Sequence, residues 1–252
     1  MGVDTKIEWC HHTFNPWRGC TKVSLGCKHC YAEALSGRNP KLLGKWGPDG
    51  TRIIASESYW RQPKIWNRDA DRAGERRQVF CASLADVFED RPELEAPRSR
   101  LRWLMFDTAQ LDWLLLTKRP EFARQWIDSN LMPRNYWVGV SVEDQQRADE
   151  RIPILLQTPA PVRFLSVEPL LGPVDFRKWL PSVNWVIIGG ESGPYARPCN
   201  IAWIRSVVRQ CQDASVAVFV KQLGSHLKLK DKKGGDLSEF PEDLQFREFP
   251  RS

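Results

Sequence analysis

Three cysteines, Cys20, Cys27 and Cys30, occur close together with the spacing C-x6-C-x2-C. A closed structural zinc site needs four protein ligands and usually shows two paired half-sites in the sequence. Three thiolates without an equally obvious fourth ligand suit a metal centre that keeps one position open for chemistry. An iron–sulfur cubane held by three thiolates would leave one iron free for a substrate or cofactor. The spacing therefore predicts a metal centre with Cys20, Cys27 and Cys30 as its ligands.

A zinc site is the main alternative interpretation of the same cysteines. Cys10, together with His11 and His12, lies near enough in the sequence to offer a fourth ligand. Such a Cys/His site would anchor the N-terminal loop without catalysis. Two other cysteines, Cys81 and Cys211, lie within apolar runs and are interpreted as small core residues.

The residues around the cysteines form a longer signature. IEW (7–9), TFNPWRGC (13–20) and SLGCKHCYAE (24–33) resemble the phage Gp37/Gp68 family, which is similar to a branch of the radical S-adenosylmethionine (SAM) enzymes. Three later segments extend the resemblance over most of the chain: SVEP (166–169), GGESG (189–193) and VKQ (220–222). The commonest radical SAM spacing is C-x3-C-x2-C, so the longer first gap here enlarges the cluster loop and keeps the ligand count.

The resemblance implies two cofactors, a [4Fe–4S] cluster and SAM. A cluster reduced by an external one-electron reductant would split SAM into methionine and a 5′-deoxyadenosyl radical. That radical would take a hydrogen atom from an unreactive carbon of the substrate. Iron–sulfur potentials reach about −700 mV, so this type of cluster can supply the electron.

Short β-branched or aromatic runs recur along the chain, and several of the intervals between them have a helical pattern. The runs lie at 12–15, 79–83, 113–117, 137–142, 162–167, 185–188 and 216–220. Near-continuous apolar runs are typical of strands buried on both faces of a parallel sheet. One helix is predicted from Ile201, Ile204, Val208 and Cys211, which share a face behind a plausible Asn200 cap. The pattern predicts an α/β fold with about seven βα units. The resemblance implies the same architecture, a partial (β/α) barrel of the radical SAM type with six or seven parallel strands.

Three segments of the chain are distinguished by composition. Residues 1–223 are predicted to form the partial-barrel domain, with 38–78 as an irregular insertion or lid because Gly44, Gly47 and Gly50 interrupt regular structure. Residues 224–252 are predicted to be a basic C-terminal appendage with a hairpin around 234–235.

Polar residues recur where the predicted strands end, and parallel barrels gather functional side chains at that edge. The candidates for SAM or substrate binding are Ser83, Asp86, Lys118, Ser141, Glu143, Glu168 and Glu191. The alternative is that these are helix caps or loop residues, for which such residue types are common.

Similarity to radical SAM folds implies roles for these candidates. Ser83 and Asp86 would contact the amino group of SAM, and Lys118 its carboxylate. Ser141 and Glu143 would contact its ribose. The superfamily's usual Gly-Gly-Glu element follows the second strand, whereas Glu191 ends a late strand, so it would contact adenine or substrate instead.

Charge and hydropathy narrow the class of protein. The chain of 252 residues has a net charge of +6, which favours association with polyanions, although a solvated basic surface is an equally simple interpretation. No apolar run approaches the roughly 18 residues that cross a bilayer, and the N-terminal residues lack the apolar core of a signal peptide. These features predict a cytoplasmic protein without a membrane anchor, in the phage-infected host cell if it is phage-encoded. The cysteines are then expected to be reduced.

The resemblance also suggests a substrate, since members of the phage family occur in pathways that hypermodify thymine bases in DNA. There a radical SAM isomerase moves a glycine on the thymine 5-methylene from a nitrogen linkage to a carbon linkage. The predicted partner is therefore DNA or a modified nucleotide. The alternatives are radical repair or modification of another base or of a peptide, and a zinc-stabilised nucleic-acid-binding protein without catalysis.

Overall fold

The computed structural model describes residues 5–250, and this part of the chain divides into two compact units. The ranges of unit 1 are 5–23, 30–138 and 158–161, and those of unit 2 are 24–29, 139–157 and 162–250. Two parts of the sequence predictions lie outside the described residues. They are residues 1–4 of the N-terminus, predicted to lack a signal peptide, and residues 251–252 of the predicted appendage.

Within residues 5–250, seven strands form one sheet in the order β1-β4-β5-β6-β7-β8-β9. Their bounds are β1 His12–Thr13, β4 Arg77–Cys81, β5 Leu111–Thr117, β6 Tyr136–Ser141, β7 Val162–Val167, β8 Trp185–Gly189 and β9 Ala217–Gln222. The pairs β1–β4, β4–β5, β7–β8 and β8–β9 are parallel. All seven predicted strands are confirmed, with bounds that differ from the predicted ones by a few residues at most.

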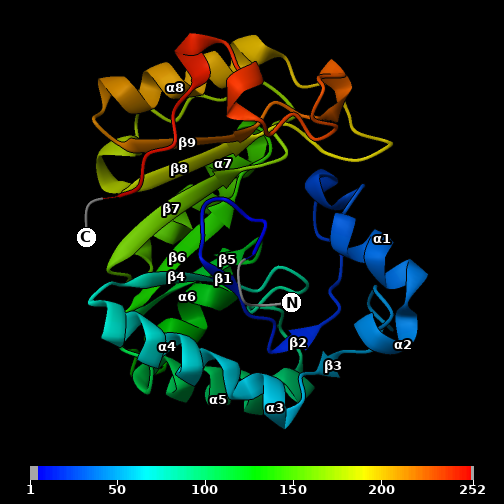
Figure 1. The fold of residues 1–252 in the computed structure, drawn as a ribbon, viewed down its shortest axis with the longest axis vertical. Helices are drawn as coiled ribbons and strands as arrows, with labels where there is room; N and C mark the ends of the chain where they lie inside the picture. The colour runs from blue at the N-terminus through cyan, green and yellow to red at the C-terminus, as the bar shows by residue number, and fades with distance from the viewer. Residues whose placement is uncertain (1–4, 251–252) are drawn as a thin grey trace. The chain divides into compact units, whose positions relative to one another are not determined.

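Unit 1 contains both short and longer helices. Its helices are α1 Tyr31–Arg38, α2 Pro40–Leu43, α3 Glu57–Trp60, α4 Gln62–Ala73, α5 Glu95–Phe106 and α6 Pro120–Asp128. Helix α4 lies beside β4 and β5 (Figure 1) and buries Trp66 and Ala70, which are one helical turn apart. It ends at Gly74, whose left-handed conformation (φ 67°) lets its N–H bond back to the last turn.

The segment 38–78 is more regular than the sequence predicted. It contains α3, α4 and β3 (Ile53–Ile54), which pairs antiparallel with β2 (Trp17–Arg18). The glycines predicted to break structure lie between 44 and 50, where the chain has no helix or strand. The pattern of α4 was missed because its few buried residues are interspersed with charged ones.

Unit 2 contains two long helices, α7 (Gln145–Gln157) and α8 (Ile201–Asp213). The predicted helix at Ile201 is confirmed, because Asn200 accepts a hydrogen bond from the Ala202 N–H (2.9 Å) and so caps α8. Ile204 and Val208 are buried, and α8 runs beside β8 and β9 (Figure 1).

The C-terminal residues 224–250 belong to unit 2 and pack on its edge strand. The Val220 N–H donates to the Phe246 carbonyl (2.8 Å), and the Glu248 N–H donates to the Val218 carbonyl (3.0 Å). Leu244 is fully buried. The turn before Gly234 is present, but no strands flank it in the described residues, so the predicted hairpin is wrong. The segment covers the edge of β9, and its apolar residues explain why it packs there despite its largely polar composition.

Each unit has its own aromatic core. Phe14, Trp17 and Trp113 are completely buried in unit 1, as are Phe164 and Trp185 in unit 2. No helix within residues 5–250 is both long enough and apolar enough to cross a bilayer.

Candidate functional site

The cysteine motif lies in loops that begin where short elements end. Cys20 follows β2 and Cys30 caps the N-terminus of α1, both in unit 1, whereas Cys27 ends the 3₁₀ turn Leu25–Cys27 in unit 2. All seven cysteines are free thiols. Among the described residues, no three or more His, Cys, Asp or Glu side chains are already arranged to hold a metal ion. Cluster ligation by the three cysteines therefore stays a prediction from the motif.

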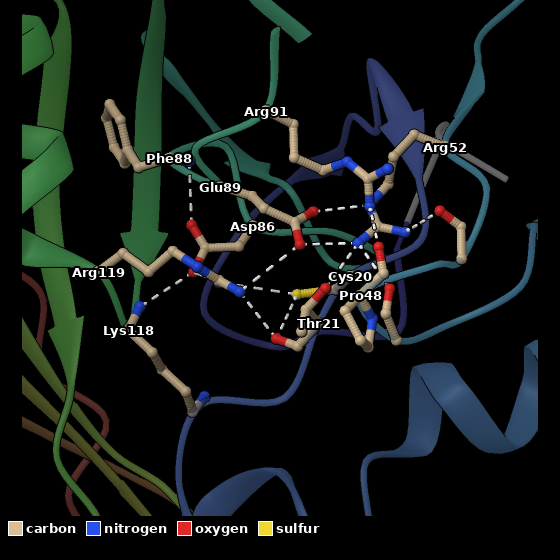
Figure 2. Close-up of polar contacts among 12 residues, drawn as sticks. Cys20, Thr21, Pro48, Arg52, Asp86, Phe88, Glu89, Arg91, Lys118 and Arg119 are labelled. Carbon is tan, nitrogen blue, oxygen red and sulfur yellow. Dashed lines mark hydrogen bonds and ion pairs between the residues drawn. The ribbon is translucent and has the colours of Figure 1, made fainter. Parts of the chain in front are cut away.

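In unit 1, the guanidinium of Arg119 contacts the first cysteine of the motif (Figure 2). Its Nη1 lies 3.8 Å from the Cys20 Sγ, and its Nη2 donates to the Thr21 carbonyl at 2.8 Å. Arg119 comes from the loop after β5, directly before Pro120 begins α6. Its neighbour Lys118 was a predicted site residue, whereas Arg119 was not.

Asp86, a predicted SAM ligand, is a buried acceptor that organises two strand ends. Its Oδ1 accepts from the Thr117 hydroxyl (2.8 Å) and the Phe88 N–H (3.0 Å). Its Oδ2 accepts from the Lys118 N–H (3.1 Å) and from Arg119 Nη1 (2.8 Å). The carboxylate of Asp86 therefore fixes the loop that carries Lys118 and Arg119.

A second buried ion pair holds the same cysteine loop from the other side. Arg52 Nε and Nη2 donate to the two Glu89 oxygens at 2.6 and 2.7 Å, and both side chains are almost completely buried. The same Nη2 donates to the Thr21 hydroxyl at 2.9 Å. Figure 2 shows Asp86, Glu89, Arg52 and Arg119 around Cys20 and Thr21.

The pKa of Cys20 reflects this environment. Burial, with a smaller contribution from the Asp86 and Glu89 charges, raises the pKa of Cys20 to about 12, although Arg119 acts in the opposite direction. The thiol is therefore neutral at pH 7 unless a bound cation compensates the thiolate charge.

Ser83, the other predicted ligand after β4, links this region to α1. Its hydroxyl hydrogen-bonds the Asn15 side chain (3.1 Å), and its carbonyl accepts from the Tyr31 hydroxyl (2.7 Å). Tyr31 directly follows Cys30. Ser83 therefore contacts the element that Cys30 caps.

In unit 2, Glu143 holds the loop between the first two cysteines. Glu143 is fully buried at the end of β6 and pairs with Arg151 Nη1 (2.8 Å) of α7. Its Oε1 accepts a hydrogen bond from the Ser24 hydroxyl and another from the Gly26 N–H (3.4 Å). A Cβ at Gly26 would lie 2.9 Å from that oxygen, so this close approach requires glycine. Ser141, also predicted as a ligand, accepts from Arg151 through its carbonyl (2.7 Å).

Glu191 holds the second part of the same loop. Arg197 donates from Nη2 and Nε to its two oxygens at 2.6 and 2.9 Å, and His29 Nδ1 lies 3.1 Å from Oε2. Arg197 Nη1 also donates to the Leu25 carbonyl at 3.0 Å. Burial alone would raise the pKa of Glu191, but hydrogen bonds from Arg197 and His29 lower it to about 2.

Glu168, the remaining candidate, pairs with a residue of the neighbouring sequence signature. Lys221 Nζ of β9 lies 2.7 and 2.8 Å from the two Glu168 oxygens. Both side chains are only partly buried, so they are open to solvent or a ligand.

Each unit thus gathers some of the predicted residues. Ser83, Asp86 and Lys118 lie together near Cys20 and Tyr31 in unit 1, and Glu143 and Glu191 contact the loop 24–29 in unit 2. The cations and one acid that complete these networks were not among the predicted residues: Arg52, Glu89, Arg119, Arg151 and Arg197. A usable signal existed, because a buried carboxylate requires a partner cation and arginines such as Arg119 and Arg197 follow some of the predicted strand ends.

A family model described as "Protein of unknown function (DUF5131)" matches residues 4–244. No curated protein matches the chain. One similar structure is a spore photoproduct lyase mutant with bound AdoMet and dinucleoside spore photoproduct, at 12% identity and a TM-score of 0.52.

The similarity covers 88% of this chain and 58% of that lyase chain, so this protein spans little more than half of the lyase's length. A second mutant of the lyase has the same identity and TM-score over 75% of this chain and 58% of its own. A third, with dinucleoside spore photoproduct, has 10% identity and a TM-score of 0.50 over 87% of this chain and 57% of its own. These similarities confirm the predicted α/β partial barrel.

The close approach of Gly26 to Glu143 predicts the effect of a single methyl group. Gly26→Ala should push the loop 24–29 away from Glu143 and make Cys27 react several-fold faster with an alkylating reagent. Peptide mass spectrometry after timed alkylation measures this rate for each cysteine. Gly37→Ala in α1 is the matched control, because a Cβ there meets nothing within 4 Å. Equal Cys27 rates in the two variants would contradict the contact.

The lowered pKa of Glu191 predicts a pH-dependent contribution to stability. The ionised carboxylate stabilises the fold fully above its unfolded pKa of about 4.3, and this stabilisation is lost as the pH falls through about 2. Glu191→Gln should cost about 1–3 kcal/mol at pH 7, with the difference from wild type shrinking below about pH 4. Urea unfolding at several pH values tests this. The control is Glu121→Gln, an exposed acid expected to change stability by less than about 0.5 kcal/mol. A Glu191→Gln penalty that does not depend on pH would refute the assignment.

Proposed function

We propose that this chain, which belongs to the DUF5131 family, is a radical SAM enzyme acting on a nucleic-acid-linked substrate. The observation that carries the proposal is the C-x6-C-x2-C motif on a parallel partial barrel. Cys20, Cys27 and Cys30 would hold a [4Fe–4S] cluster, and SAM would bind its remaining iron. The Gp37/Gp68 name given by sequence resemblance remains a prediction.

The three cysteine side chains are of the chemical type that such a cluster requires as ligands. Three free, partly exposed thiols are the ligands that iron–sulfur clusters use. The contact of Arg119 with the Cys20 sulfur also favours the thiolate that a metal requires. When bound, the cluster and SAM together supply one-electron chemistry that ends in hydrogen abstraction from carbon.

The chain's own residues would position these groups. Asp86, Glu89 and their arginines fix the loop of Cys20, while Glu143 and Glu191 fix the loop 24–29. Because these carboxylates already accept several protein hydrogen bonds, their contacts support positioning of the cysteine loops more directly than contact with SAM. Lys118 for the SAM carboxylate, Ser83 for the amino group, and Ser141 for the ribose remain proposals.

Glu168 is the acid best placed for a ligand. Its side chain pairs with Lys221, and the pair is partly exposed at the ends of β7 and β9. A partly exposed ion pair can exchange one partner for a cationic or hydroxyl-bearing ligand at a lower cost than a fully buried pair. We assign Glu168 and Lys221 to the binding of SAM or substrate.

The proposed substrate is a modified thymidine in DNA. Two of the similar lyase structures contain dinucleoside spore photoproduct, which supports a nucleic-acid substrate for a chain with this fold. The net charge of +6 favours a phosphate-rich partner. The specific proposal is isomerisation of a glycyl-modified thymidine in phage DNA, in which the glycine moves from nitrogen to carbon linkage and no atom is lost. Radical repair of another base is the second candidate, supported by the same lyase similarity.

Anaerobic purification distinguishes a catalytic iron–sulfur cluster from a structural zinc site. We expect a brown protein with iron and sulfide that yields 5′-deoxyadenosine from SAM and dithionite. Cys20→Ala, Cys27→Ala and Cys30→Ala should each lose this activity and most of the iron, whereas Cys211→Ala in the core of unit 2 should retain both. A colourless protein with stoichiometric zinc would instead identify a nucleic-acid-binding module.

The substrate proposal has its own test. The reduced protein with SAM should convert glycyl-thymidine in DNA to an isomer of unchanged mass but altered chromatographic retention and fragmentation. Glu168→Gln should weaken this conversion or SAM cleavage, and Glu121→Gln serves as an exposed control. DNA whose nucleosides keep their retention and fragmentation would exclude the isomerisation and leave lesion repair as the candidate.

A further inference from the structure

We propose that Arg119 raises the reduction potential of the cluster by donating a hydrogen bond to the sulfur of Cys20. This inference rests on the proposed function, because it concerns the cluster that Cys20 would ligate. The guanidinium contacts both the sulfur and the carbonyl of the next residue, Thr21, at 3.8 and 2.8 Å (Figure 2). One donor of the planar guanidinium therefore contacts the Cys20 sulfur, and the other holds the carbonyl of the next residue.

Two carboxylates hold the side chain of Arg119 in place. Asp86 Oδ2 accepts from the same Nη1 at 2.8 Å, and a Glu89 oxygen lies 3.6 Å from Nη2. Asp86 in turn accepts the Lys118 N–H and the Thr117 hydroxyl, which belong to the loop that carries Arg119. The side chain of Arg119 is only 15% exposed. Its position is thus fixed before any cluster binds.

The direction of the effect follows from charge. Reduction adds one negative charge to a cluster and its thiolates, and a cationic donor at a ligand sulfur stabilises that charge. Hydrogen bonds to the sulfurs and the net local charge are two of the factors that set iron–sulfur potentials. A partly buried site strengthens both effects relative to water. Arg119 therefore makes the cluster easier to reduce, while Asp86 moderates its charge.

A purely structural role for Arg119 is the competing explanation, since it also holds the Thr21 carbonyl. The two roles differ in what they change. Loss of a loop contact lowers stability or cluster occupancy, whereas loss of a charged donor moves the midpoint potential of clusters that are still bound. The test therefore measures potential and occupancy separately.

The experiment uses the full chain, reconstituted anaerobically with iron and sulfide. Arg119→Gln removes the charge and the fork, and Arg119→Lys keeps a cation. The matched control is Arg76→Gln. Arg76 also pairs with one carboxylate, Asp112 (2.6 Å), and one carbonyl, that of Ala109 (2.9 Å), but it lies at the opposite ends of β4 and β5. Iron and sulfide are counted for each protein, and midpoint potentials come from redox titration monitored by electron paramagnetic resonance.

We expect Arg119→Gln to shift the midpoint to a more negative potential, Arg119→Lys to shift it less, and Arg76→Gln to leave it at the wild-type value. A wild-type midpoint in clusters bound by Arg119→Gln would overturn the inference while leaving the proposed function intact. If Arg119→Gln does not fold, Arg119→Lys is the test, and a midpoint no more negative than that of Arg76→Gln would overturn the inference equally. A wild-type protein that binds no iron–sulfur cluster would refute the proposed function itself.

Discussion

Carboxylates buried at the ends of parallel strands impose the main constraint on this protein. An isolated buried carboxylate is too costly to remain ionised, so each must find a cation and several hydrogen-bond donors. Asp86 and Glu89 find them in unit 1, and Glu143 and Glu191 find them in unit 2. In unit 2 the loop 24–29 itself supplies part of the partner set, whereas in unit 1 Arg52 and Arg119 link the acids to Thr21 of the cysteine loop.

This arrangement gives the cysteine loops an order that their composition does not provide. The loop 24–29 contains only one short 3₁₀ turn, and the segment around Cys20 has no regular structure beyond the two-residue β2. Such loops are usually mobile unless tied down. Here Thr21 is held by Arg52 and Arg119, and Leu25 by Arg197. Ion pairs anchored on the sheet thus replace the secondary structure that the loops lack.

Arginine is suited to this task because its planar fork can join a carboxylate to a second acceptor. Arg119 joins Asp86 to the Thr21 carbonyl, and Arg197 joins Glu191 to the Leu25 carbonyl. Lysine could not make both contacts in one plane. The positive charge of the chain is therefore partly internal, and the total of +6 does not by itself describe the surface that a nucleic acid would meet.

The sequence by itself determined the parallel strands, the helix at Ile201, the cysteine motif and the acids at the strand ends. These features are local, since apolar runs, caps and motif spacing depend on neighbouring residues. The tertiary structure decided which cation each acid meets, as with Arg119 beside Cys20, a contact between residues 99 positions apart. It also decided that 224–250 pack on β9 and that α4 forms within 38–78. Such pairings depend on how distant segments are brought together by the sheet, and no local pattern encodes them.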